Sequence, residues 1–283
     1  MKKLYCLLFL CLSCTVYAQK DFKDLGVLLK LSSKYSLFPD SLRNIEPRIY
    51  QNKTYAANEH YNDSSLLIFI PTKFNASKPY EIVFWFHGWN NTIDSTIQSF
   101  NLIEQFTYAH KNALLVFVES AKNAPDSYAG KFEQPNNFNL YVQDIITQLQ
   151  HKKIAISNKP TSFIIAGHSG AYRALSYITL YSKYAIKAIV LFDALYGEEE
   201  KFSMYLRNNT NCKFLNIYTT SGGTLENSKS LYSTMVAWQW NAQSTSEETS
   251  FSRQKPYIFV KSSKNHTTVL ELFYEAYLWA SSL

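Results

Sequence analysis

A serine in a turn of small residues is the strongest chemical signal in this 283-residue chain. The turn follows the apolar run 161–166, opens a segment with helical periodicity, and reads Gly167, His168, Ser169, Gly170 and Ala171. A sharp strand-to-helix turn exposes a serine hydroxyl above the sheet, and small flanking residues keep strand and helix from colliding. We interpret Ser169 as a nucleophile, although G-x-S-x-G turns end in glycine where this chain has Ala171. The structural alternative is an ordinary glycine turn.

Strand-like and helix-like segments that would position this serine alternate along the chain. The predicted strands are 47–56, 65–70, 81–86, 113–118, 162–166, 188–192, 214–219 and 257–260. The inner ones are mostly continuous apolar runs, which is typical of a parallel sheet covered by helices on both faces. The predicted helices are 95–109, 137–152, 171–184, 198–207, 226–239 and 266–281. This alternation predicts a doubly wound α/β fold, with the ligand site at the carboxyl ends of the strands.

The chain resembles the α/β-hydrolase family in its serine turn and, over nearly all of residues 19–283, in its order of elements. A second motif supports the resemblance, because the strand 81–86 runs into His87 and Gly88, and the family's third core strand ends in His-Gly. The resemblance implies that the N–H groups of Trp89 and Gly170 form an oxyanion hole. It also implies that His87 fixes this loop and is not a catalytic base.

The base is expected late in the chain, because the family's order is serine, then acid, then histidine. Of the six histidines, only His266 follows Ser169. It lies in the loop 262–267, directly after the apolar run 257–260 and before the last helical segment. We predict that His266 is the general base. Taken alone, it would be interpreted as a surface-loop histidine.

Two carboxylates compete for the third position of the triad. Asp193 directly follows the strand 188–192, where a buried acid can hold the histidine in one tautomer and stabilise its cation. Many members of the family carry the acid after the next strand, and Glu226 is the only carboxylate in the segment 219–226. We favour Asp193 and keep Glu226 as the alternative. If it has no catalytic role, Asp193 would be a helix N-cap, and Glu226 would be a solvated residue in the first turn of a helix.

The N-terminus has the features of a cleaved secretory signal. Lys2 and Lys3 precede an apolar run, and Ala18 ends the segment at the spacing that a signal peptidase requires. We therefore predict a signal peptide at residues 1–18, a single α/β-hydrolase domain at 19–283, and a secreted or periplasmic protein of bacterial type. A lipid anchor at Cys14 is the less favoured alternative. No later apolar segment is long enough to predict a membrane span.

Composition excludes several classes of protein. With 46% hydrophobic and 18% charged residues, the chain should fold around a sizeable core. Its basic residues are scattered, so nucleic-acid binding is not expected. No HExxH or histidine-carboxylate cluster is present, and we predict neither a metal nor a cofactor. Cys212, the one cysteine left after the signal, is expected to be buried and structural.

Together these features predict an exported serine hydrolase that cleaves an ester, or an amide, through an acyl-enzyme. The partner would be a small-molecule or acyl substrate, whose identity and binding residues stay open, as does the oligomeric state. A peptidase or an acyltransferase could use the same triad. A non-catalytic binding protein on this scaffold is the third alternative. The irregular stretch 119–137 is either a wall of the substrate site or a surface loop.

Overall fold

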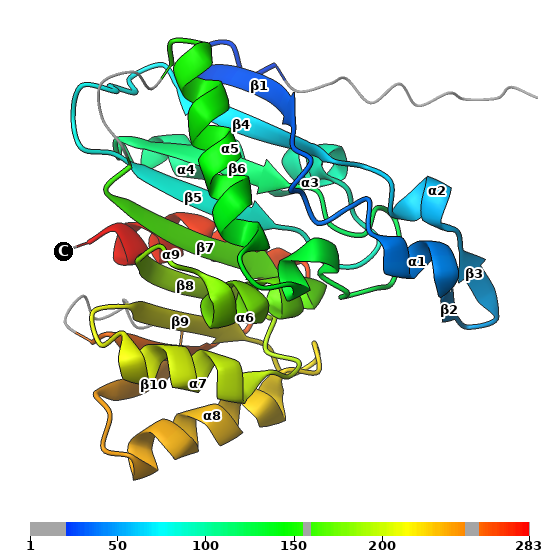
Figure 1. Ribbon diagram of the computed structural model, residues 1–283. Coiled ribbons are helices and arrows are strands. Elements are labelled where there is room, and N and C mark those ends of the chain that lie inside the picture. Colours follow the sequence, from blue (N-terminus) through cyan, green and yellow to red (C-terminus); the bar gives the residue numbers. More distant parts are fainter. Residues whose placement is uncertain (1–20, 155–159, 247–254, 283) are drawn as a thin grey trace, which may run out of the picture.

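A nine-stranded sheet forms the centre of the described part of the protein, which the computed structural model gives as residues 21–154, 160–246 and 255–282 (Figure 1). Its order is β1-β4-β6-β5-β7-β8-β9-β11-β10. β4 is antiparallel to β1 and β6, and all other pairs are parallel, which confirms the predicted α/β fold with a mostly parallel sheet. The strands are β1 (Gly26–Ser32), β4 (Ser65–Pro71), β5 (Glu81–Phe86), β6 (Ala113–Val118), β7 (Ser162–His168), β8 (Ile186–Phe192), β9 (Lys213–Tyr218), β10 (Ala242–Ser246) and β11 (Tyr257–Lys261).

Helices cover both faces of the sheet, because the inner strands are apolar on both sides. On one face, Val83 and Trp85 of β5 share a core with α3 (Ile93–Phe100), α4 (Leu102–Tyr108) and α9 (Phe273–Ser281). On the other face, Ile82 and Phe84 share a core with the remaining long helices. These are α5 (Asn137–His151), α6 (Tyr172–Tyr181), α7 (Glu199–Asn208) and α8 (Leu225–Ala237).

The order of the strands reverses at β5. β6 lies on one side of β5 and β7 on the other, and the loops after β5 and β7 lead to α3 and α6 on opposite faces. Ligands of such sheets bind where two loops diverge in this way at the carboxyl ends of neighbouring strands. The loops concerned begin at His87 and Ser169, the two motifs found in the sequence.

Several elements differ from the sequence-based expectation. Both edge strands, β1 and β10, lie outside the predicted strands. β10 is polar and only half-buried, and β1 exposes Val27, so neither has the hydrophobic pattern of an inner strand. The predicted helix 95–109 divides at Asn101, which takes a left-handed conformation with φ 50°. The predicted helix 266–281 begins as a 3-10 helix, η3 (Thr268–Leu272).

The predicted strand 47–56 is not part of the large sheet. It forms a separate hairpin of β2 (Arg48–Tyr50) and β3 (Lys53–Tyr55), turned by Gln51 and Asn52 with positive φ, as two-residue hairpin turns require. The short helices α1 (Ser41–Ile45) and α2 (Ala57–His60) flank the hairpin. We call residues 41–60 the arm, and Figure 1 shows it projecting to one side of the sheet.

The predicted signal peptide, residues 1–18, lies outside the described residues. Among the residues that are described, no helix has the length and apolar character needed to cross a membrane.

Candidate active site

Ser169 occupies the sharp turn between β7 and α6, in a short 3-10 helix (η2, Ser169–Ala171). Its φ of 54° lies in the left-handed region, which L-residues adopt at a cost. The glycines beside it are required because a side chain would not fit at their positions. A Cβ on Gly167 would lie 2.6 Å from the Cβ of Ala171, so strand and helix can approach only because both residues are small. This contact explains why alanine serves at the last position of the pentapeptide.

Ser169, His266 and Asp193 come together as a chain of hydrogen bonds. His266 Nε2 lies 2.9 Å from Ser169 Oγ, and His266 Nδ1 lies 2.7 Å from Asp193 Oδ2. The alternative acid, Glu226, is not part of this chain. It lies in the first turn of α8 with a side chain that is 80% exposed, and it forms an ion pair with Lys229.

The Asp193 carboxylate is fully buried at the end of β8 and hydrogen-bonded at both oxygens. Thr219 donates to it through its N–H, at 3.0 Å, and through its hydroxyl, at 2.8 Å, and the Thr224 hydroxyl donates as well. Burial opposes ionisation, but the hydrogen bonds from His266, Thr224 and Thr219 outweigh it and hold the pKa of Asp193 at about 2. The loop after β9, where the sequence offered Glu226, thus supplies the hydroxyl groups that keep Asp193 ionised.

The loop after β5 passes directly over the serine. A Cβ on Gly88 would lie 2.6 Å from Ser169 Cβ, so only glycine allows this approach. Trp89 and Gly170 both line the cavity that holds Ser169. The Trp89 indole covers Gly170 and donates a hydrogen bond of 2.8 Å from Nε1 to Ser127 Oγ. Ser127 belongs to the irregular stretch 119–137, which therefore contributes one wall of the cavity.

His87 is buried below this loop and fixes one of its peptide groups. Its Nδ1 lies 2.8 Å from Gly88 O, and because a carbonyl can only accept, Nδ1 carries a proton. Its Nε2 lies 2.7 Å from the buried carboxylate of Glu119 at the end of β6. Glu119 also accepts a hydrogen bond from Ile93 N, at the start of α3. One buried carboxylate thus joins β6, α3 and the loop after β5.

His168 is a second buried histidine in the site. Its ring lies 4.6 Å from the His266 ring, and its Nε2 donates to the His266 backbone carbonyl at 2.7 Å. Burial, together with repulsion from His266, lowers the pKa of His168 to about 4, so the ring is neutral at pH 7. The sequence placed His168 in the turn but held no signal for this contact, which joins residues 98 positions apart.

The cavity around the serine has a volume of about 560 Å³ and a wall of both aromatic and polar side chains. Its rings come from Trp89, Phe100, Tyr172 and Tyr196, and its polar groups from Asn90, Asn91, Ser127 and Thr267. Trp238 is half exposed and is not among the residues that line this cavity. Within the described ranges, no group of histidine, cysteine and acidic residues could hold a metal ion. Burial raises the pKa of the Cys212 thiol, as expected for a structural cysteine.

The comparisons with known proteins support the fold. Neither a family model nor a curated protein matches the chain. A mutant feruloyl esterase module from Clostridium thermocellum, complexed with sinapinate, is similar in structure with TM-score 0.57 and 12% identity, over 92% of this chain and 90% of that one. A fluorophosphonate-binding serine hydrolase from Staphylococcus aureus is similar with TM-score 0.55 and 11% identity, over 92% of this chain and 100% of that one. An S-formylglutathione hydrolase from Agrobacterium tumefaciens is similar with TM-score 0.52 and 9% identity, over 94% of this chain and 97% of that one. The chain has the α/β-hydrolase fold.

The buried His168 predicts a pH-dependent stability. An unfolded histidine takes up a proton below about pH 6.5, whereas native His168 stays neutral down to about 4, so stability should fall as pH decreases through this window. Urea unfolding at pH 7.5 and 4.5 should show that His168 contributes about 2.5 kcal/mol to the loss of stability. His168→Gln can still donate to His266 O but cannot titrate, so this variant should lose less stability between pH 7.5 and 4.5 than the wild-type protein does. His151→Gln, at an exposed position, serves as the control. An equal loss of stability in the His168 and His151 variants would contradict the prediction.

Proposed function

We propose that this protein is a serine hydrolase that cleaves carboxylic esters through an acyl-enzyme intermediate. The observation that carries the proposal is the hydrogen-bond chain from Ser169 through His266 to Asp193. A nucleophile, a base within reach of its proton, and a buried acid that orients the base are the parts that this chemistry requires. The esterases and serine hydrolases that share the fold lend further support.

In the proposed mechanism, His266 Nε2 takes the proton of Ser169 as Oγ attacks the ester carbonyl. Asp193, with its pKa at about 2, stays ionised throughout, holds the Nδ1 tautomer and stabilises the imidazolium. His266 then gives the proton to the leaving alkoxide, and water cleaves the acyl-enzyme by the same route. An alkoxide leaves more easily than an amine, so we favour ester over amide cleavage.

The oxyanion hole would consist of the N–H groups of Trp89 and Gly170, and His87 sets the direction of one of them. Gly88 O and Trp89 N belong to the same planar trans peptide, in which C=O and N–H point in opposite directions. The hydrogen bond from His87 Nδ1 to Gly88 O therefore fixes where the Trp89 N–H points. Glu119 in turn holds His87 through Nε2. A donor fixed before the reaction stabilises the developing oxyanion without reorganisation.

The cavity lining favours an ester with an aromatic or other flat apolar group. Four aromatic rings surround the space next to Ser169. Tyr196 is half-buried among them, and its hydroxyl donates to Gly222 O. Its partial burial raises its pKa to about 12, so it stays neutral. The similar feruloyl esterase module was solved with sinapinate, an aromatic acid.

We further propose that the protein acts outside the cytoplasm, after export and removal of residues 1–18. The charged start, apolar run and small residue at Ala18 support this proposal. N-terminal sequencing of the protein recovered from its native host should find Gln19 first.

Labelling with a fluorophosphonate probe tests the nucleophile. The wild-type protein should react covalently, because His266 activates Ser169, and Ser169→Ala should not react. Ser99→Ala, an exposed serine near the cavity, should label like the wild type. A folded wild-type protein that does not react would overturn the hydrolase proposal and favour a binding protein on this scaffold.

Substitution of the two acids tests the triad. Asp193→Asn should lower kcat for p-nitrophenyl acetate by about 10⁴, because the amide no longer fixes the histidine tautomer or its charge. Glu226→Gln should keep wild-type kcat, since this side chain is exposed and paired with Lys229. The reverse pattern would assign the acid to Glu226.

Substitution of His87 tests the orientation of the oxyanion donor. His87→Phe removes the donor to Gly88 O, and kcat/KM should fall by about 10² to 10³ while KM changes little. Affinity for a phenylboronic acid, which mimics the tetrahedral intermediate, should fall in parallel. His87→Asn offers an N–H near the position of Nδ1 and should recover part of both losses. If His87→Phe folds and keeps full activity, the orienting role is wrong.

A further inference from the structure

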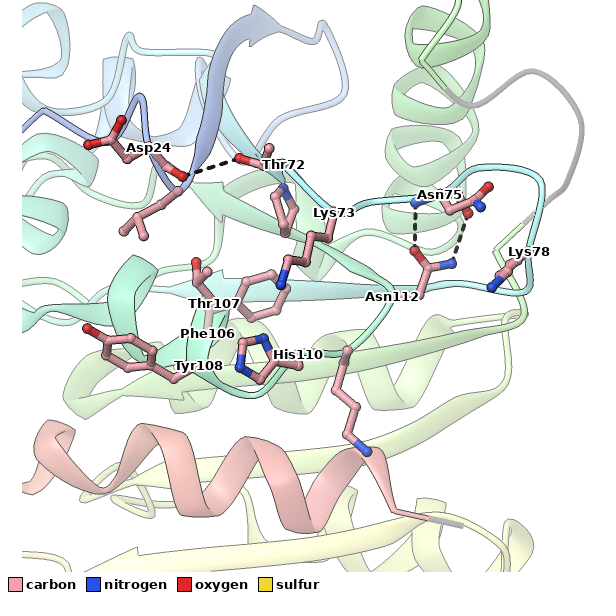
Figure 2. Close-up of a pocket in the computed structure, with 13 residues that line it drawn as sticks. Asp24, Thr72, Lys73, Asn75, Lys78, Phe106, Thr107, Tyr108, His110 and Asn112 are labelled. Carbon is pink, nitrogen blue, oxygen red and sulfur yellow. Dashed lines mark hydrogen bonds between the residues drawn. The ribbon is translucent and has the colours of Figure 1, made fainter.

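A groove leads away from the catalytic cavity between α4 and the η3–α9 segment. It has a volume of about 530 Å³, and both Phe100 and Thr267 line the cavity and the groove, so the two adjoin. Tyr108, at the end of α4, lines the groove and also a further cavity of about 450 Å³ (Figure 2). Three hollows thus follow one another from Ser169 to the far end of α4.

The proposed mechanism places the alcohol part of the ester on the side of this groove. His266 must protonate the leaving oxygen, so the alcohol lies beside His266 Nε2 while the acyl group is bound to Ser169. Thr267, the next residue in the chain, is the point where the cavity meets the groove. A large alcohol group would therefore extend from His266 past Thr267 and into the groove.

The lining of the groove suits a hydroxyl-rich chain. Tyr108, with 61% exposure, and the half-buried Tyr274 offer rings with polar tips. Hydroxyl and amide groups come from Ser99, Asn101, Thr267 and Thr268. The lining also includes Leu270 and the carboxylate of Glu271, which is paired with Lys264. A lining that mixes rings with polar groups fits a carbohydrate better than a lipid, which needs a continuous apolar wall.

The groove is also preformed. Gln105 lies between its two sides and donates through its amide to Phe100 O and Leu270 O, both at 3.1 Å. The Gln105 carbonyl accepts from Tyr274 N at 3.0 Å. One side chain thus holds α4, η3 and α9 at a fixed separation, and a ligand would not need to open the groove.

The far cavity is basic. Among the described residues that line it are Lys73, Lys78, Lys111 and His110, and Asp24 is the only acidic one of this set. None of the three lysines makes an ion pair with the described residues. Figure 2 shows the Lys73 side chain pointing toward the other residues that line this cavity. Such a grouping of uncompensated positive charge attracts an anion.

From the adjoining groove, its ring-and-hydroxyl lining and the basic cavity at its far end, we propose that the protein binds an O-acylated anionic polysaccharide. The acylated sugar would lie at Ser169, the chain would follow the groove past Tyr108, and its anionic groups would reach the lysine-lined cavity. This inference rests on the proposed function for the direction of the alcohol group, and on the cavities themselves for the choice of ligand.

Binding without turnover tests the choice of ligand. Affinity electrophoresis of the wild-type protein should show binding to polygalacturonate or dextran sulfate, weakened by salt, and much weaker binding to neutral dextran. Binding to one polyanion alone would identify the group recognised as carboxylate or sulfate. The double variant Lys73→Glu/Lys111→Glu should weaken polyanion binding by about tenfold or more. The control Lys30→Glu/Lys152→Glu changes two exposed lysines elsewhere and should bind like the wild type.

Kinetics separate this inference from the proposed function. Tyr108→Ala and the Lys73/Lys111 variant should lower kcat/KM for acetylated polygalacturonate and leave turnover of p-nitrophenyl acetate unchanged. Normal polymer turnover by these variants, or equal binding of dextran and polyanions, would overturn the inference while the hydrolase proposal stands. A wild-type protein that cleaves neither ester would overturn the proposed function, and the binding experiment would still decide whether the lysine-lined cavity recognises polyanions.

Discussion

The approach of Gly88 to Ser169 is the contact on which the rest of the site depends. β5 and β7 are adjacent and parallel, with Phe86 opposite Gly167, so their loops begin side by side at one edge of the sheet. Only a residue without a side chain can pass over Ser169 there. That passage places the loop carrying Trp89 next to Ser169. The reversal of strand order at β5 then sends the two loops to opposite faces and leaves the space between them for a substrate.

The site is held by buried polar contacts between strands that are distant in sequence. Ser169 and Asp193 both have positive φ, a conformation that persists only where the surroundings determine it. Thr219 and Thr224, which follow β9, fix Asp193 after β8. His168, at the end of β7, fixes the backbone of His266, which follows β11. Rigid hydrogen-bonded supports of this kind keep reacting groups aligned before substrate arrives.

The three side chains that the structure joins by hydrogen bonds each carry a local signal in the sequence. Ser169 has its glycine turn, and His266 and Asp193 directly follow apolar strands, so the topology of a parallel sheet brings them to one edge. The contact of His168 with His266 and that of Glu119 with His87 carried no such signal, since both arise only from packing. For the same reason the inner strands were predictable, whereas the edge strands β1 and β10 were not, because an exposed edge imposes little constraint on composition.

The acid site is divided between two strands, with the carboxylate after β8 and its hydroxyl donors after β9. His266 needs one negatively charged acceptor at Nδ1. A carboxylate on the loop after β9 could supply the same charge if the hydroxyl donors stood on the loop after β8. Gly222, where a Cβ would lie 1.7 Å from the Asp193 carboxylate, shows how closely the two loops share this volume. An acid that moved between neighbouring loops during divergence would therefore leave the chemistry intact, and its position along a sequence is a poor guide to common descent.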